Sequence, residues 1–183
     1  SPINVPPNVT LLNDEVLRPG ALDKACEGQD AVLSALGIRR KNQANPWSPL
    51  SSPADFTSRT AQLLVDAMKK NAVGKVIAVS ASGVGDSKPG LNLMMKFFIN
   101  YTNIGANYRD LEDMEKTYAN STVDWCCVRP TGLKDGPLTK KTKVINSFPF
   151  NAWISKADVA HWMVEHLTSD VSANRTPIIT EAK

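Results

Sequence analysis

The chain has 183 residues, a length that suits one domain with one substantial core. Of these residues, 42% are hydrophobic and 21% are charged, which is an ordinary globular composition. The net charge of only +3 argues against a nucleic-acid-binding protein, and the lack of a long apolar run argues against a membrane-spanning one. The three cysteines lack metal-ligand spacing, which argues against a metal-binding protein. We therefore expect a cytoplasmic protein, in a reducing compartment, with no nucleic-acid partner, no membrane partner and no metal.

The predicted elements alternate between short apolar strands and helices with one apolar side. A strand over 31–36 and a strand over 75–79 are the clearest of the early ones, and "DWCCVR" predicts another strand over 124–129. The complete prediction, in chain order, is strand 9–12, helix 19–27, strand 31–36, a helix opened at 52–55 and ended at 71–74, strand 75–79, a helical region from about 91, helix 108–120, strand 124–129, a helix from 155 to about 167 and strand 176–180.

Two of the predicted helices carry capping signals at their starts. Ser52 is followed by Pro53 and by Asp55 three residues later, and Ser155 precedes Asp158 by the same spacing. The helix over 108–120 carries four acidic residues, which we interpret as a solvated, helix-supporting surface: Asp110, Glu112, Asp113 and Glu115.

The alternation of strands and helices predicts parallel strands that are joined by right-handed crossovers. The strands are nearly continuous apolar runs, which is typical of strands covered by helices on both faces. We therefore predict an α/β protein with a doubly wound parallel sheet, in which residues 1–183 form a single domain.

Three predicted strands are followed by small residues at their carboxyl ends. Gly37 follows the strand over 31–36, "SASGVGDS" follows the next strand, and "PTGL" follows the strand over 124–129. Ligands of open parallel sheets bind beyond these ends, where small residues let backbone N–H groups approach a ribose or a nicotinamide and hydroxyls add hydrogen bonds. The pattern predicts a nucleotide-like ligand; the alternative is that strand-to-helix loops are small and polar whatever their function.

Five segments in this order resemble a known family: "GQDAVLSALG", "VDAMKKNAVGKVIAVSASGVGDS", "LEDMEKTYANSTVDWCCVRPTGL", "DGPLT" and "ISKADVAHWMVEHL". Together they resemble the NAD(P)H-binding atypical short-chain dehydrogenase/reductase group, which includes flavin reductase/biliverdin-IXβ reductase and the NmrA-like proteins. The resemblance covers nearly all of the chain. It implies a Rossmann-like fold and a nicotinamide cofactor, NAD or NADP, of which we favour NADP.

The resemblance also implies which residues line the cofactor. The family's serine falls on Ala81, which Ser80 and Ser82 flank. These two serines are the candidate catalytic residues, because either hydroxyl could contact the nicotinamide or a substrate carbonyl. The alternative is that they cap the next turn. The family's histidines at the substrate mouth fall on Glu115 and Gly132, which argues against carrying over their substrate. By position, the implied cofactor-binding residues are Glu15, Val16, Ser34, Ala35, Leu36, Gly37, Ser80, Ala81, Ser82, Pro130, Thr131, Gly132 and Leu133.

Two features of ordinary dinucleotide-binding dehydrogenases are absent from the sequence: a G-x-G-x-x-G turn and a Tyr-x-x-x-Lys pair. Gly83-x-Gly85 follows the wrong strand and precedes Asp86, which would repel phosphate. We therefore expect an N-terminally incomplete sheet that lacks the glycine-rich βαβ unit and its central strand, with apolar edges of two neighbouring strands exposed. A fragment of a longer protein, a natural shortened relative and a second chain that fills the gap are the three explanations.

Three functions are compatible with these residues. The one we favour is an NAD(P)H-dependent oxidoreductase that reduces flavin or a similar flat conjugated substrate. Trp47, Phe97, Phe98 and Tyr101 are a candidate surface for such a substrate. The alternative is that Phe97 and Phe98 lie in the core or at a subunit contact. The other two functions are a non-enzymatic NmrA-like nucleotide-sensing or interaction protein and a partial domain without cofactor binding. We expect a small-molecule substrate as one partner. The other expected partner is a chain that completes the sheet, either a second copy of this chain or a different one.

Overall fold

The computed structural model describes residues 5–147, 151–170 and 174–182. Its elements are, in chain order, α1 (Ala21–Cys26), β1 (Ala31–Ser34), α2 (Phe56–Lys70), β2 (Lys75–Val79), the 3₁₀ helix η1 (Gly85–Gly90), α3 (Leu93–Tyr101), α4 (Ile104–Ala119), β3 (Asp124–Pro130), β4 (Gly132–Lys134), β5 (Thr142–Ile145), β6 (Trp153–Ser155), α5 (Lys156–Glu165) and β7 (Ile178–Glu181). Within this part of the chain, none of the helices has the length and apolar character that crossing a membrane requires.

The main sheet has five strands in the order β1-β2-β3-β7-β5. The first four strands run parallel, as predicted, whereas β5 pairs antiparallel with β7. A second, parallel pair is formed by β4 and β6. The prediction of a doubly wound, mostly parallel sheet is confirmed, but β4, β5 and β6 were missed because strands of three or four partly exposed residues leave no apolar run in the sequence.

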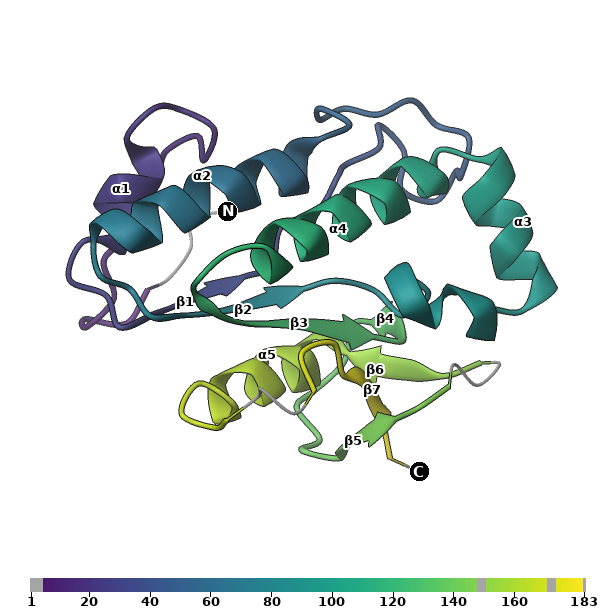
Figure 1. Ribbon diagram of the computed structural model, residues 1–183. Coiled ribbons are helices and arrows are strands. Elements are labelled where there is room, and N and C mark those ends of the chain that lie inside the picture. The colour runs from purple at the N-terminus through teal and green to yellow at the C-terminus, as the bar shows by residue number, and fades with distance from the viewer. Residues whose placement is uncertain (1–4, 148–150, 171–173, 183) are drawn as a thin grey trace.

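Helices cover both faces of the sheet: α1, α2 and α4 lie on one side and α5 on the other (Figure 1). Successive residues of β2 point to opposite faces, so that Val76 and Ala78 pack in the cluster with α2 and α4, and Ile77 packs in the cluster with α5. In β3, Cys127 and Cys126 divide in the same way. This two-sided burial is why the sequences of these strands are continuously apolar.

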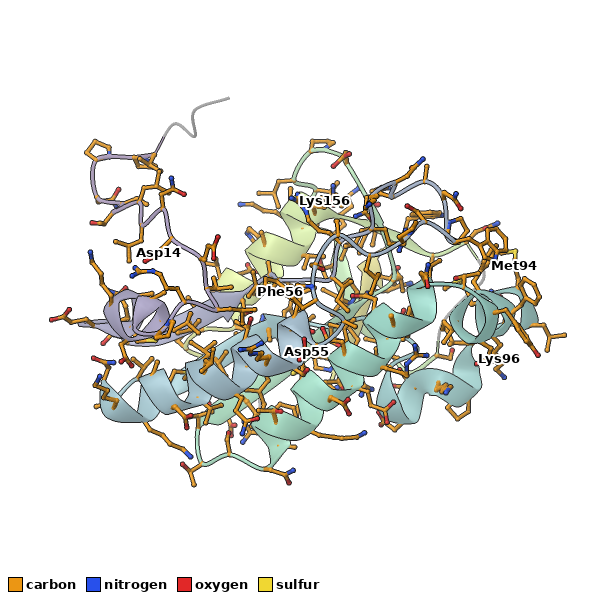
Figure 2. The ribbon with its side chains drawn as sticks, turned by 90° about the horizontal axis from the view of Figure 1, so that it is seen from above. Asp14, Asp55, Phe56, Met94, Lys96 and Lys156 are labelled. Atoms are coloured by element: carbon orange, nitrogen blue, oxygen red, sulfur yellow. The ribbon has the colours of Figure 1, made fainter. Side chains whose placement is uncertain are left out.

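The first turn of α2 is capped by a residue from another helix. Asp110 of α4 accepts hydrogen bonds from the backbone N–H groups of Thr57 (2.8 Å) and Ser58 (2.9 Å) and from both of their hydroxyls. The prediction that Ser52 caps this helix is wrong, because its hydroxyl accepts instead from the backbone N–H of Arg39 (2.8 Å). Helices α2 and α4 lie side by side in both views (Figures 1 and 2).

The cap predicted for α5 is confirmed. The hydroxyl of Ser155 accepts a hydrogen bond from the backbone N–H of Asp158 (2.9 Å) and donates one to its carboxylate (2.7 Å). The same carboxylate accepts from the backbone N–H groups of Thr139 and Lys140, each at 2.8 Å. The start of α5 is thereby tied to the loop that leads into β5.

The strand predicted over 9–12 is wrong. Val9, Leu11 and Leu12 are exposed and form no strand, and this segment projects from the body of the protein on the side of Asp14 (Figure 2). An extended apolar segment becomes a strand only when a neighbour pairs with its backbone. The expectation of two exposed edges around a central gap is also wrong: the five-stranded sheet is continuous, and β1 is one of its two end strands, with Leu33 41% exposed.

Candidate functional site

The carboxyl ends of β1, β2 and β3 meet at one rim of the sheet. Ser34 ends β1 in register with the last residues of β2. The ladder between β2 and β3 then continues beyond β2, because Ser80 and Ser82 donate their backbone N–H groups to the carbonyls of Val128 (2.7 Å) and Pro130 (3.1 Å). The predicted convergence of the strand exits is therefore present in the structure.

A buried ion pair lies directly behind this rim. Arg129 of β3 donates from Nε (2.9 Å) and Nη2 (2.6 Å) to the carboxylate of Glu115 on α4, and Ser80 Oγ donates to the same carboxylate at 2.6 Å. Arg129 and Glu115 are only 3% and 7% exposed. The interpretation of Glu115 as part of a solvated surface is thus wrong, as it is for the buried Asp110.

The charge of Arg129 is secured by two carboxylates. Burial acts to lower its pKa, but the hydrogen bonds and negative charges of Glu115 and Asp86 outweigh burial and raise the pKa above the usual value. Asp86, although 81% exposed, is thereby neutralised as a partner of Arg129 rather than placed to meet a phosphate. The arginine therefore stays charged.

The two glycines of Gly83-x-Gly85 have structural roles at this site. Gly85 has a φ of +54°, and a Cβ there would lie 2.9 Å from Arg129 Nη2, so only glycine lets the backbone pass so close to the ion pair. Gly83 donates its N–H to Ser87 Oγ at 2.8 Å. Both positions serve the turn between β2 and η1.

The hydroxyls of Ser80 and Ser82 differ in their partners. Ser80 Oγ is bound to Glu115, whereas Ser82 Oγ makes no hydrogen bond to any residue that the structure describes. Neither hydroxyl caps the next turn, a role that Ser87 fills. Tyr108 covers this stretch and donates to the carbonyl of Ser82 at 3.3 Å, and burial raises the pKa of Tyr108 to about 12.

The exit of β3 is less open than the sequence indicated. Thr131 and Gly132 already donate their backbone N–H groups to carbonyls of β7 (3.0 Å) and of Ala152 (3.1 Å). The ring of Trp153 lies against Gly132, where a Cβ would be 2.7 Å from it. These two N–H groups are therefore not free to meet a ligand, and within 130–133 only Leu133 is well exposed. That 130–133 line the cofactor stays a prediction.

The exit of β1 borders a cavity of about 320 Å³. Val16 lines this cavity together with Ser34, Ala35 and Leu36, so these predicted cofactor residues are brought together, whereas Glu15 and Gly37 are exposed and outside the lining. The rest of the lining is mostly apolar and comes from α1, β1, the turn between them and α2: Leu22, Ala25, Cys26, Gln29, Ala31, Val32, Leu33, Thr60 and Leu64. A concave, mostly apolar surface of this kind suits the base of a nucleotide.

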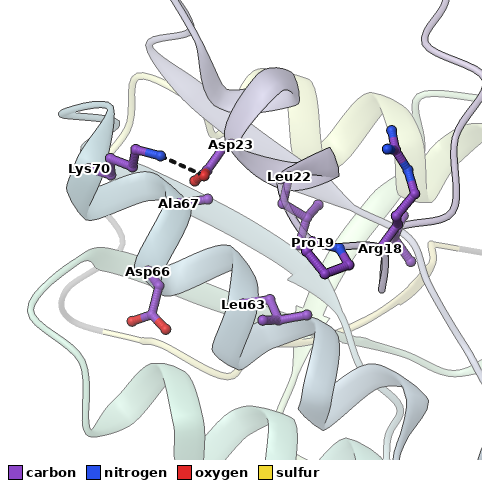
Figure 3. Close-up of a pocket in the computed structure, with 10 residues that line it drawn as sticks. Arg18, Pro19, Leu22, Asp23, Leu63, Asp66, Ala67 and Lys70 are labelled. Carbon is purple, nitrogen blue, oxygen red and sulfur yellow. Dashed lines mark hydrogen bonds and ion pairs between the residues drawn. The ribbon is translucent and has the colours of Figure 1, made fainter.

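A second hollow, of about 360 Å³, adjoins the first between α1 and α2 (Figure 3). The two hollows share Val16 and Leu22. An ion pair between Lys70 and Asp23 (2.7 Å) closes one end of the second hollow. The region beyond the free edge of β1 is therefore hollowed and largely apolar.

Helix α3 and the loop between β1 and α2 lie beside each other (Figure 1), and together they carry a chain of aromatic rings. The ring centroids of Trp47 and Phe98 are 6.3 Å apart, those of Phe98 and Phe97 6.0 Å, and those of Phe97 and Tyr101 5.1 Å. Asn103 holds the loop in place by donating to the carbonyls of Trp47 and Ser48, each at 3.0 Å. Trp47, Phe97 and Tyr101 are 57%, 50% and 69% exposed, so they are not core residues.

Residues 2–170 match the model of a protein family described as NAD(P)H-binding. The chain belongs to the NAD(P)H-binding family. The match confirms the family resemblance of the sequence and covers every strand exit described above. It also accounts for the small residues at the rim better than the general polarity of loops does.

Solved structures with the same fold agree with this family. The anaerobilin reductase ChuY of Escherichia coli O157:H7 is 21% identical, with a TM-score of 0.71 over 93% of this chain and 74% of ChuY. A short-chain dehydrogenase/reductase of Veillonella parvula, solved in complex with NADP, is 15% identical, with a TM-score of 0.70 over 94% of this chain and 72% of its own. At these identities the similarity establishes the Rossmann-like fold of this NAD(P)H-binding chain.

Proposed function

We propose that the chain is an NAD(P)H-dependent oxidoreductase of the atypical short-chain dehydrogenase/reductase type, which reduces flavin or a similar flat conjugated substrate. The observation that carries this proposal is the shared rim of β1, β2 and β3, where a base-sized apolar cavity and two serines lie at adjacent strand ends. Membership of the NAD(P)H-binding family supports a nicotinamide cofactor. The solved complex of a similar fold with NADP supports the same class of ligand.

The residues of the rim suit the two ends of such a cofactor. The cavity of Val16, Ser34 and Leu36 would hold the adenine, and the stretch from Ser80 to Ser82 would hold the nicotinamide. The bound nicotinamide supplies the hydride, and the protein supplies binding and orientation. The sequence has no glycine-rich turn for the pyrophosphate, so we expect weaker binding than a complete phosphate site gives.

The chain of aromatic rings on α3 and the loop between β1 and α2 suits a flat substrate. Trp47 and the rings of α3 present exposed edges and faces within reach of one another, and aromatic surfaces of this kind bind conjugated ring systems by stacking. Hydride transfer to such a ring requires mainly placement, and a protein acid is not needed. Tyr108, with its pKa of about 12, keeps its proton at neutral pH and acts as a hydrogen-bond donor.

The test is to incubate the purified chain with NADPH and FMN and to follow the nicotinamide absorbance band. We expect oxidation of NADPH that depends on both the protein and the flavin, and a lower rate for Ser82→Ala. Ser169→Ala, which removes a serine hydroxyl that donates to the carbonyl of Glu165 at the end of α5, serves as the matched control and retains the rate. Absence of both binding by calorimetry and oxidation would overturn the proposal.

A nucleotide-sensing protein without turnover is the second candidate. It is favoured by the absence of a Tyr-x-x-x-Lys pair and by the engagement of Glu115 and Arg129 with each other, which leaves neither free to move a proton. Calorimetry separates the two functions. Tight NADP⁺ binding, with no oxidation of NADPH by FMN or by a linear tetrapyrrole, would assign the chain to this second function.

A further inference from the structure

The two end strands of the main sheet differ in how their free edges are protected. β5 carries Lys143, and Lys140 and Lys141 precede it. Lysines on an end strand keep other chains from pairing with its backbone. β1, at the opposite end, reads Ala-Val-Leu-Ser, without a charged residue or a proline, and its Leu33 is exposed. The free edge of β1 is therefore open to a further strand.

The segment 9–12, Val-Thr-Leu-Leu, has the apolar composition of a strand but no strand beside it. Its three large apolar side chains, Val9, Leu11 and Leu12, are all exposed. Within the part of the chain that the structure describes, the backbone of 10–12 makes no hydrogen bond. Pairing with a neighbouring strand would bury these side chains and bond this backbone, and both changes are favourable.

The segment leaves the body of the protein close to the edge of β1. Val16 lines the cavity along β1, so the chain reaches the body at this edge. Just before it, the carboxylate of Asp14 accepts a hydrogen bond from Nε of Arg18 at 2.7 Å, which fixes the turn. The residues before Asp14 project away from the body (Figure 2), and they do not pair with the β1 of their own copy.

We propose that the chain forms a two-fold dimer in which the segment 9–12 of each copy adds to the free edge of β1 in the other copy. The donor segment and the acceptor edge lie on the same side of the molecule, so one two-fold axis satisfies both exchanges and closes the assembly. The incoming strand bonds the free backbone groups of β1. Neither the segment nor β1 carries a charge, so the contact joins two apolar surfaces.

The side chains of the segment match the two faces of β1. In β1, Val32 packs on the face of α2, where the apolar cavity lies, and Leu33 points to the opposite face. The same alternation places Val9 and Leu11 on one face of the added strand and Leu12 on the other. In the dimer, the partner's Val9 and Leu11 enter the cavity, and the partner's Leu12 covers Leu33.

The exchanged strand and the nucleotide use the same cavity. The cavity along β1 is the one proposed for the adenine, and a copy that holds the partner's Val9 and Leu11 there cannot hold the base as well. The nucleotide therefore favours the monomer, because a ligand shifts an equilibrium toward the form that binds it. This consequence rests on the proposed function, whereas the strand exchange does not.

Sedimentation equilibrium of the purified chain tests the dimer. At micromolar concentrations we expect twice the chain mass of 19.9 kDa for the wild type and the mass of one chain for Leu11→Asp. Each dimer buries two copies of Leu11, so the substitution should raise the dimer dissociation constant at least about hundredfold. The matched control is Leu138→Asp, between β4 and β5, where the leucine is 45% exposed against 55% for Leu11. It should keep the wild-type dissociation constant.

A mixture of two variants separates strand exchange from direct pairing of two β1 edges. Leu11→Asp lacks the donor segment but keeps the acceptor edge, and Leu33→Lys lacks the acceptor edge but keeps the donor. Each alone is expected to be monomeric, and their mixture is expected to form a heterodimer through one exchanged strand, about tenfold weaker than the wild-type dimer. The mixture is measured at about a hundred times the wild-type dissociation constant.

Three results of these measurements would overturn the inference: a monomeric wild type, a dimer that Leu11→Asp leaves intact, and a mixture that stays monomeric. Circular dichroism checks that both variants are folded. Leu11 contacts solvent in the single chain, so its replacement should not disturb the fold.

Titration with NADP⁺ tests the shared cavity. We expect saturating NADP⁺ to raise the dimer dissociation constant at least about tenfold, and Leu11→Asp to bind NADP⁺ more tightly than the dimeric wild type by a similar factor. Equal affinity of monomer and dimer for NADP⁺ would overturn the placement of Val9 and Leu11 in the cavity. A dimer that forms while no NADP⁺ binds to either variant would overturn the proposed function and support the exchange.

Discussion

The exits of β1 and β2 lie side by side on one rim, yet they are built differently. Beyond β2, Ser80 and Ser82 are buried, and their N–H groups are bonded to β3. Beyond β1, Ala35 and Gly37 are exposed, and the strand has a neighbour on one side only. The rim therefore has a closed half, at the exit of β2, and an open half, at the exit of β1.

The difference shows where a parallel sheet can orient a small group. A strand with neighbours on both sides fixes the backbone beyond its end, and the ion pair of Arg129 and Glu115 then fixes a hydroxyl on that backbone. An end strand fixes much less, so the open half offers a surface rather than directed hydrogen bonds. The closed half therefore presents directed hydrogen-bonding groups, and the open half presents an apolar surface.

Among the substitutions considered for the closed half, replacement of Arg129 by methionine should lower stability most. It leaves the carboxylate of Glu115 buried without its partner, and we expect a loss of about 3–5 kcal/mol in the free energy of unfolding. Urea denaturation measures the loss. Asp86→Ala is the control: it removes the exposed partner of the same arginine and should cost less than about 1 kcal/mol. Equal losses for the two variants would contradict the buried ion pair as the stabilising contact.

Asp110→Ala tests the packing that supports the closed half. The substitution removes the cap of α2 and leaves the N–H groups of Thr57 and Ser58 buried without a partner, which should cost about 2–3 kcal/mol. Thermal unfolding followed by circular dichroism measures the effect. Asp113→Ala, an exposed aspartate of the same helix, should change stability by less than about 0.5 kcal/mol. A similar midpoint for both variants would show that Asp110 is not the cap.

The pH dependence of stability tests whether the hydroxyl of Tyr108 is buried beside the closed half. Burial raises the pKa of Tyr108 from 10.0 to about 12, so the folded chain keeps this proton when the unfolded chain has lost it. Its contribution to stability is therefore independent of pH below about pH 10, and it is lost at about 1.4 kcal/mol per pH unit between the unfolded and folded pKa values. Burial also raises the pKa values of Tyr118, Cys126 and Cys127, so both proteins lose stability as the pH rises. Tyr108→Phe should make this decline shallower in urea unfolding curves between about pH 9 and 11, by the share of Tyr108. Parallel declines in both proteins would refute burial of the hydroxyl.

Leu33→Lys places a charge on β1, in the open half of the rim, where the expected effect on stability is smallest. The side chain lies on the free end strand, so the free energy of unfolding should change by less than about 0.5 kcal/mol. Self-association is expected to fall instead, because a lysine on an edge strand blocks edge-to-edge pairing. Light scattering after gel filtration compares it with Leu93→Lys, which replaces an apolar side chain of α3 that is 84% exposed. If only the latter variant disperses the protein, association runs through α3.

The elements that depend on residues close together in the chain were predicted well from the sequence. Strand β2 was predicted over the residues it occupies, because burial on both faces leaves an unbroken apolar run between polar flanks. The Ser155 cap of α5 was also predicted, since its partner Asp158 lies only three residues away. The convergence of strand exits followed from parallel topology alone, and with it the position of the two serines.

The remainder depended on partners that are distant in sequence. Asp110 bonds residues more than fifty positions earlier, and Glu115 finds Arg129 on another element, so both read as surface acids in a helix. Thr131 and Gly132 read as ligand contacts because nothing in the sequence shows that β7 and the segment before β6 use their N–H groups.

The cap of α2 by Asp110 also constrains the order of folding. The groups that complete the first turn of α2 come from α4, so this turn cannot reach its final form until the two helices have docked. Helices α2 and α4 should then behave as one cooperative unit in native-state hydrogen exchange, with the amides of Thr57 and Ser58 protected to the same free energy as the middle of α4.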